Sequence, residues 1–236
     1  MTFWFYIAIP VLVTIVGSVV ATFRTVPDLV RSGLQHFTAG VVFAALAGEL
    51  LPDVLHRQAP IATVLGFVAG VAVMFGMRRW TGHLEGDDPS TSKPVSGLLL
   101  AVGVDALLDG LVIGISFTAG QTVGILVTIA LSLEMFFLGV TTALSLRARG
   151  VAAGRASMLT CGLALLIAVG AGMGLTVFAG ASNAVLAGTL AFGCAALLYL
   201  VTEELLVEAH SVEETPLVTS LFFAGFLTIL VVEMAL

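Results

Sequence analysis

The sequence predicts an all-α integral membrane protein, a single transmembrane domain of eight helices that covers residues 1–236. The first reason is composition, because 59% of the residues are hydrophobic, 10% are charged, and the mean hydropathy is +1.14. A soluble domain of this length needs much more polar surface. The second reason is that the apolar residues form runs of about 20, the length that a helix needs to cross the hydrocarbon core. The 26 glycines also suit a membrane helix bundle, because small residues let helices approach closely.

Eight apolar runs reach this length. In chain order they are about 3–23, 31–55, 59–79, 95–118, 122–146, 154–179, 183–209 and 215–235. The first run lacks a basic flank and a small-residue cleavage site, so we expect a spanning helix and not a signal peptide. Two of the connections are tight polar turns, AGQT (119–122) and GASN (180–183). The only sizeable polar loop is TGHLEGDDPSTSKP (81–94), whose Pro, Gly, Ser and acidic residues predict a linker.

Lys and Arg residues predict the orientation, because they concentrate on the cytoplasmic side of membrane proteins. With the N-terminus outside, eight of the nine basic residues lie in or beside cytoplasmic loops. These eight are Arg24, Arg31, Arg78, Arg79, Lys93, Arg147, Arg149 and Arg155. Only Arg57 then lies outside. We therefore expect both termini outside and a multi-pass protein of the bacterial inner (plasma) membrane. The net charge of −6 and the lack of a basic stripe argue against a nucleic-acid partner.

Two pairs of segments resemble each other within the chain. DALLDGLVIGISF (105–117) aligns without gaps with EMFFLGVTTALSL (134–146), so that an acid heads each segment, and ELLPD (49–53) is similar to ELLVE (204–208). In the predicted topology the two members of each pair cross the membrane in opposite directions. Inverted repeats of this kind are common in transporters, whose binding sites lie at the repeat interface near the midplane.

Acidic residues are frequent inside the predicted spans. Eight of the fifteen lie in the second, fourth, fifth and seventh of these spans, namely Glu49, Asp53, Asp105, Asp109, Glu134, Glu203, Glu204 and Glu208. An ionised carboxylate at the centre of a membrane helix costs about 2.5–3.5 kcal/mol on insertion scales. No Lys or Arg lies deep within a span, so we do not expect a basic partner to offset this cost. The cost can then be lowered only by protonation, by water in a cavity or by a bound cation. Each of these indicates a cation or proton pathway.

Three of these acids are predicted to meet near the midplane. Asp105 and Asp109 are one helical turn apart on one face, ten to fourteen residues into their span. Glu134 lies at a similar depth on the next span, which runs back in the opposite direction. Three carboxylates in a medium of low dielectric cannot all stay charged unaided. We therefore predict that Asp105, Asp109 and Glu134 form a cation site.

The other intramembrane acids are predicted to flank this site. Glu49 and Asp53 would lie on the outer side of the pathway, and Glu204 and Glu208, with Glu203, on the cytoplasmic side. Because Asp53 and Glu208 are close to span ends, solvated interfacial acids are an equal alternative for these two. Glu203 and Glu204 are adjacent and so point about 100° apart on a helix. We favour Glu204 as the pathway residue, because it is four residues before Glu208 and shares its face.

The histidines and Pro52 are weaker indications of an ion site. The four histidines, His36, His56, His83 and His210, all fall near span ends or in loops. For each we favour a water-exposed or interfacial side chain over a metal ligand. Pro52 lies within ELLPD and should disturb the local backbone hydrogen bonds, either as a simple kink or by exposing a carbonyl to an ion.

The predicted spans and their acids resemble the ZIP (ZRT/IRT-like) divalent-metal transporters. The resemblance includes eight spans with both termini outside, and it runs through HFTAGVVFAALAGELLPD (36–53), DALLDGLVIGIS (105–116) and AGTLAFGCAALLYLVTEELLVE (187–208). It implies a metal centre, often binuclear, built from H-N-x-P-E-G-like motifs on the fourth and fifth helices. The expected ions are zinc, iron or manganese.

The fourth-helix motif departs from the family pattern. Asp105 stands at the His position, Ala106 at the Asn position and Leu108 at the Pro position. Asp109 occupies the acid position and Gly110 follows it. The motif has therefore exchanged its imidazole for a carboxylate.

The fifth-helix motif departs in a similar way. Glu134 takes the first position, whereas Met135 and Leu138 replace polar residues. Glu49 stands where family members often have the His of HLLPE, and His83 is the one histidine of the loop that is His-rich in many members. The resemblance thus implies a single site of Asp105, Asp109 and Glu134, and it leaves a second metal site open.

The change from imidazole to carboxylate shifts the expected ion. Carboxylates and water suit magnesium, calcium and manganese, whereas imidazole suits zinc, copper, nickel and iron. We therefore expect Mn(II) first, then Fe(II), Zn(II) and Mg(II), as the transported substrate, with no other cofactor. Exchange of metal for protons on the carboxylates would make transport pH-dependent.

The predicted function is thus uptake of a divalent cation, without enzymatic activity, and three alternatives stay open. The first is a proton conductor with the same fold, and the second is a relative that senses ions without transporting them. The third is an intramembrane aspartyl-type enzyme using Asp105 and Glu134, although GxGD, HExxH and GxSxG motifs are absent. Besides the ion and the bilayer, a second copy of the chain is a candidate partner. The small-residue face GLALLIAVGAGMG (162–174) suits either a homodimer or internal packing.

Overall fold

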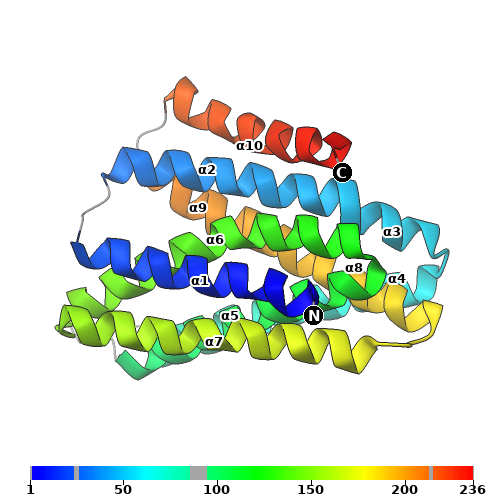
Figure 1. Cartoon of the computed structure of the whole chain (residues 1–236), viewed down its shortest axis with the longest axis horizontal. Coiled ribbons are helices and arrows are strands. Elements are labelled where there is room, and N and C mark those ends of the chain that lie inside the picture. Colours follow the sequence, from blue (N-terminus) through cyan, green and yellow to red (C-terminus); the bar gives the residue numbers. More distant parts are fainter. Residues whose placement is uncertain (1, 24–26, 86–94, 213–214, 236) are drawn as a thin grey trace.

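Eight helical spans, packed side by side, make up the protein (Figure 1). The computed structural model describes residues 2–23, 27–85, 95–212 and 215–235. Within these residues the chain is helical without strands, and eight helices are long and apolar enough to cross a membrane. The predicted fold class and the eight spans are therefore confirmed, and the protein is an integral multi-pass membrane protein.

Six spans are single helices and two contain a π-helical turn. The single helices are α1 (Thr2–Phe23), α4 (Pro60–Glu85), α5 (Val95–Ala119), α6 (Gln121–Ala148), α7 (Ala153–Phe178) and α10 (Pro216–Ala235). The second span comprises α2 (Asp28–Ala45), the π-turn η1 (Leu46–Leu50) and α3 (Leu51–His56). The seventh span comprises α8 (Asn183–Tyr199), the π-turn η2 (Leu200–Leu205) and α9 (Leu206–Ala209). The predicted loop 81–94 begins too early, because α4 continues to Glu85, and residues 86–94 lie outside the described part.

The two π-turns occupy equivalent places in the similar segments ELLPD and ELLVE. In η1 the amide of Leu51 donates to the carbonyl of Leu46, five residues earlier, and in η2 the amide of Leu206 donates to that of Val201. The disturbance expected at Pro52 is therefore a π-turn just before the proline, which has no N–H of its own to donate. Since η2 contains no proline, a π-turn at this place does not require one. Single π-turns occur frequently at functional sites.

Glycines bring four pairs of helices into backbone contact. In each pair a Cβ on the glycine would overlap a carbonyl oxygen of the facing helix: Gly139 with Thr14 (α6–α1), Gly110 with Ile167 (α5–α7), Gly40 with Phe222 (α2–α10) and Gly66 with Gly188 (α4–α8). Such contacts are typical of membrane helices, where small residues permit close van der Waals packing.

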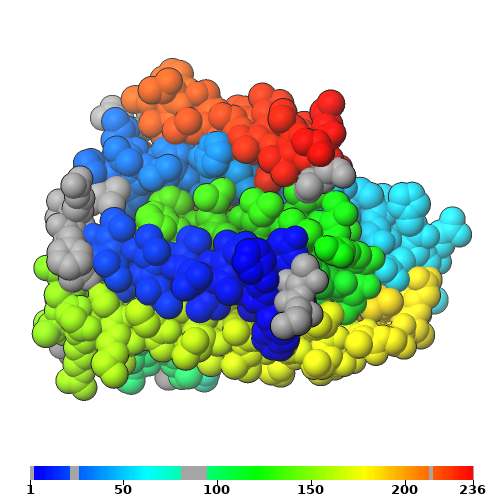
Figure 2. All heavy atoms as spheres, viewed as in Figure 1, coloured from blue at the N-terminus to red at the C-terminus, as the bar shows by residue number. Residues whose placement is uncertain are grey.

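The exterior of the bundle is apolar. Large hydrophobic side chains are exposed along α1, α4, α7 and α10, including Leu12, Leu65, Leu165 and Leu227. Figure 2 shows α1, in dark blue, and α10, in red, on the outer surface of one face of the molecule. In a bilayer these side chains contact lipid. Both termini lie at the same end of the bundle, as an even number of spans requires (Figure 1).

Candidate metal centre

Three carboxylates from two neighbouring helices meet inside the bundle. Asp105 and Asp109 on α5 and Glu134 on α6 each offer an oxygen, and these oxygens lie within 4.8 Å of one another. The side chains of Asp109 and Glu134 are buried, with exposed fractions of 7% and 5%. Asp109 Oδ2 and Glu134 Oε2 are buried without a hydrogen-bond partner in the described part of the chain. The structure therefore brings together the three acids that the sequence placed near the midplane.

The helix packing determines where these acids lie. Asp105 and Asp109 are four residues apart and so share one face of α5. The tight connection at Gly120 makes α5 and α6 antiparallel, which brings Glu134 to the same depth. Gly110 lies against the backbone of Ile167 on α7, and this contact holds the α5 turn that carries Asp109.

Like charges at this separation repel one another strongly. At an effective dielectric constant of 20, two unit charges 4.8 Å apart repel by about 3.5 kcal/mol, and the cluster contains three such pairs. Arg31 pairs with Asp28, Arg57 with Asp53 and Arg78 with Glu203, and none of these ion pairs in the described part of the chain includes a member of the cluster. A proton or a cation is therefore needed to balance the charge of the cluster.

Two cavities reach the cluster from the same end of the bundle. The larger, of about 270 Å³, lies between α4, α5 and η2, and its walls include Arg78, Tyr199, Asp105 and Glu204. The smaller, of about 80 Å³, is also lined by Asp105 and Glu204, and in addition by Glu134. Both extend toward the end where most of the basic residues lie, which the positive-inside rule makes cytoplasmic. Asp109 lines neither cavity, so the cluster is reached from its Asp105 side.

The acids predicted for the cytoplasmic side take different positions. Glu204 lines both cavities, and Glu208 lines the smaller one. Glu203 lines the larger cavity, where its carboxylate accepts a hydrogen bond of 2.5 Å from the Arg78 guanidinium. The expectation that these acids lack a basic partner is therefore wrong for Glu203. The side chain of Arg78 is 57% exposed, so this pair lies at the surface of the bundle.

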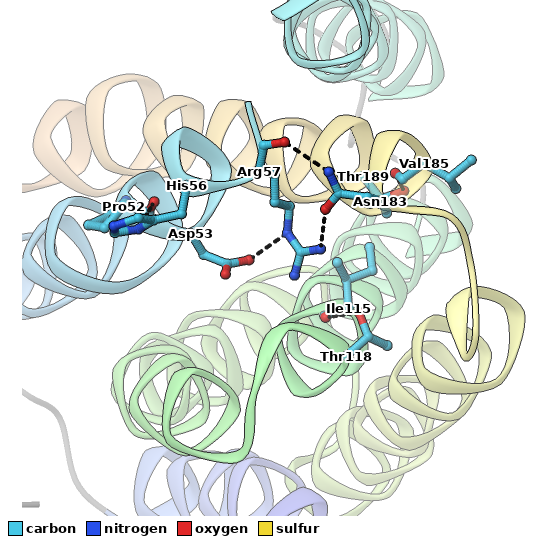
Figure 3. Close-up of polar contacts among 9 residues, drawn as sticks. All are labelled: Pro52, Asp53, His56, Arg57, Ile115, Thr118, Asn183, Val185 and Thr189. Carbon is cyan, nitrogen blue, oxygen red and sulfur yellow. Dashed lines mark hydrogen bonds and ion pairs between the residues drawn. The ribbon is translucent and has the colours of Figure 1, made fainter. Parts of the chain in front are cut away.

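The acids predicted for the outer side lie away from these cavities. Asp53 accepts a hydrogen bond of 2.8 Å from Arg57, so the expected lack of a basic partner is wrong here too. Arg57 also donates to Asn183 Oδ1 at 3.3 Å, and the Asn183 amide donates to the Arg57 carbonyl at 2.8 Å (Figure 3). Glu49 lies in η1, beside Gly48, and Gly48 packs against the carboxylate of Glu233 on α10. The residues lining the two cavities include neither Glu49 nor Asp53.

The histidines divide into two kinds. His56 and His210 are exposed, as predicted, and the side chain of His83 lies outside the described residues. His36 was predicted to be exposed or interfacial, and this is wrong because its side chain is only 1% exposed. The cause is the packing of the seventh span on α2, where the Ser32 hydroxyl donates to the Ala209 carbonyl at 2.7 Å.

Gln35 is a cavity residue that the sequence reasoning missed. Its side chain lines the smaller cavity with Glu134 and Glu208, and its Oε1 is buried without a hydrogen-bond partner among the described residues. Gln35 lies in a segment with several polar residues, RSGLQHFT (31–38), so its sequence context did not distinguish it. The Ser116 hydroxyl, by contrast, donates to the Val112 carbonyl of its own helix at 2.8 Å and remains a structural group.

Comparisons of the chain with protein-family models and with curated proteins found no match. The resemblance to the ZIP transporters consequently rests on the residues and the topology described above.

Proposed function

We propose that this protein is a ZIP-like transporter that carries a divalent cation across the bacterial inner membrane into the cytoplasm. The observation that supports this most directly is the cluster of Asp105, Asp109 and Glu134, buried in the bundle without an ion pair to a basic residue in the described part of the chain. A buried carboxylate that lacks a basic partner is a functional-site signal in a membrane protein. A divalent cation would supply the missing positive charge.

The ligand atoms favour a hard cation. The cluster offers only carboxylate oxygens. These oxygens suit Mn(II) and Mg(II), whereas zinc prefers sites rich in imidazole. We rank Mn(II) first, followed by Fe(II), Zn(II) and Mg(II). Three carboxylates and one divalent ion leave a single negative charge, which a proton balances, and this makes metal and proton binding interdependent.

The cavities support a route between the cluster and the cytoplasm. Asp105 and Glu204 line both cavities, so an ion leaving the cluster would meet Glu204 next. Toward the other end, fully buried apolar side chains such as Ile113 and Leu131 flank the cluster. A site accessible from one side at a time is what alternating access requires.

Proton conduction is the second candidate, and one observation favours it. Asp105, Glu134, Glu204 and Glu208 all line the smaller cavity, and a row of carboxylates of this kind suits proton transfer. The two candidates differ in whether a metal crosses the membrane.

Uptake by proteoliposomes tests both candidates. Purified protein would be reconstituted, and uptake of Mn(II), Fe(II), Zn(II) and Mg(II) would be measured together with the internal pH. Asp105→Asn and Glu134→Gln remove charge with little change in shape, and Asp28→Asn is a matched control because Asp28 is exposed at the start of α2. Saturable Mn(II) uptake that is lost in the two cluster variants and kept in the control supports the transporter. Proton flux without metal uptake would support the proton conductor and contradict the transporter. Transport of none of these ions would overturn both candidates.

A further inference from the structure

Two histidines from different spans lie together near the cytoplasmic end of the bundle. His36 on α2 and His210, directly after α9, have ring centroids 5.1 Å apart, with the ring planes at 62°. The carboxylate cluster contains neither of them. Their neighbours in sequence, Gln35 and Glu208, line the smaller cavity that reaches the cluster.

Backbone hydrogen bonds define which ring nitrogen carries the proton. His36 Nδ1 lies 3.0 Å from the Ser32 carbonyl oxygen, and His210 Nδ1 makes the equivalent contact with the Leu206 carbonyl. A carbonyl oxygen only accepts hydrogen bonds, so Nδ1 is the donor in both rings. In a neutral imidazole with this tautomer the lone pair is on Nε2. Histidines that bind metals commonly donate their other ring N–H to a backbone carbonyl in this manner.

The burial of His36 is the second observation that points to a ligand. The side chain is 1% exposed, and Nε2 is buried without a hydrogen-bond partner in the described part of the chain. Buried polar atoms in proteins are almost always paired, so an unpaired imidazole nitrogen needs a reason. A metal ion bound to Nε2 would satisfy it.

We propose that His36 and His210 form a second metal site, separate from the carboxylate cluster, for a transition-metal ion that prefers nitrogen ligands. The two Nε2 atoms supply two ligands, and water completes the coordination shell. Imidazole selects Zn(II), Ni(II) and Cu(II), whereas the carboxylate cluster favours Mn(II) and Mg(II). Since one ligand is on α2 and the other follows α9, a bound ion links the second and seventh spans.

The site does not depend on the transport function, and its test does not use transport. Full-length protein without a polyhistidine tag would be titrated with Ni(II) by calorimetry, and the Cu(II)-loaded protein would be examined by electron paramagnetic resonance. We expect hyperfine splitting from imidazole nitrogens, and Ni(II) binding at least ten-fold weaker in His210→Ala. His36→Ala should have the same effect, and if that variant is misfolded then His210→Ala decides, because His210 is exposed.

His56→Ala is the matched control. His56 donates through the same ring nitrogen to the Pro52 carbonyl at 2.8 Å, but it lies at the opposite end of the second span from His36. The Ni(II) binding that His210→Ala weakens should be unchanged in His56→Ala. Equal Ni(II) affinity in wild type and His210→Ala would overturn the proposal. An equal loss in His56→Ala would also overturn it, since binding would then be a general property of exposed histidine.

Discussion

The outer end of the second span and the midplane cluster treat acidic residues in opposite ways. At the outer end, Asp53 is paired with Arg57, and Arg57 and Asn183 exchange two hydrogen bonds that tie the end of α3 to the start of α8 (Figure 3). In the cluster that the sequence predicts near the midplane, Asp105, Asp109 and Glu134 lie together without such a partner among the described residues. The hydrogen bonds of Arg57 with Asn183 connect two helices, whereas the like charges of the cluster repel one another.

The largest expected effect comes from giving the cluster the basic partner that Asp53 already has. Glu134→Lys places an ammonium group beside Asp105 and Asp109, next to a cavity that accommodates it. We expect Mn(II) uptake by proteoliposomes to fall more than about 100-fold, which corresponds to about 2.8 kcal/mol. Glu134→Gln serves as the comparison without added charge. Wild-type uptake in Glu134→Lys would mean that the cluster does not carry the ion.

Metal binding should stabilise the protein through the cluster. At a Mn(II) concentration of 100 times Kd, the expected gain is about 2.7 kcal/mol, a rise in Tm of roughly 5–10 °C. Protons compete with the metal for carboxylates, so the rise should be larger at pH 7.5 than at pH 5. Differential scanning fluorimetry in detergent measures this rise in Tm. An identical rise in Glu134→Gln, or no dependence on pH, would contradict the proposed site.

In the absence of metal the two regions should respond with opposite signs. Glu134→Gln removes a repelling charge and should raise Tm by roughly 2–4 °C, about 1 kcal/mol. Arg57→Ala leaves Asp53 without its partner and should lower Tm by a similar amount. The measurement is thermal unfolding of protein treated with chelator. A change of Tm in the same direction in both variants would contradict the proposed difference between the two regions.

The smallest expected effect is that of Asn183→Ala. This change removes the two hydrogen bonds with Arg57 and leaves the Arg57–Asp53 ion pair in place. Each hydrogen bond contributes about 0.5–1.5 kcal/mol, and solvent exposure keeps the loss near the lower value. Tm should fall by about 2 °C, with Mn(II) uptake unchanged. A loss of uptake in this variant would connect the outer end directly to transport.

The candidate site was more predictable than its surroundings. The four-residue spacing of Asp105 and Asp109 determines their common face, and the short α5–α6 connection determines the depth of Glu134. The pairing of Arg78 with Glu203 was missed, because the two are 125 residues apart and Arg78 approaches from another helix. The burial of His36 was missed for a similar reason, since hydropathy does not indicate which neighbouring helix covers a polar side chain.

The sequence by itself determined the eight spans, the sign of the charge at each end of the bundle and the positions of the acids along the helices. These properties follow from transfer free energies and helical periodicity, which are local. Only the tertiary structure decided which acids have a basic partner, which of them line the cavities, and that His36 and His210 meet. Each of these depends on contacts between helices far apart in the chain, and such contacts are set by the packing of whole helices against one another.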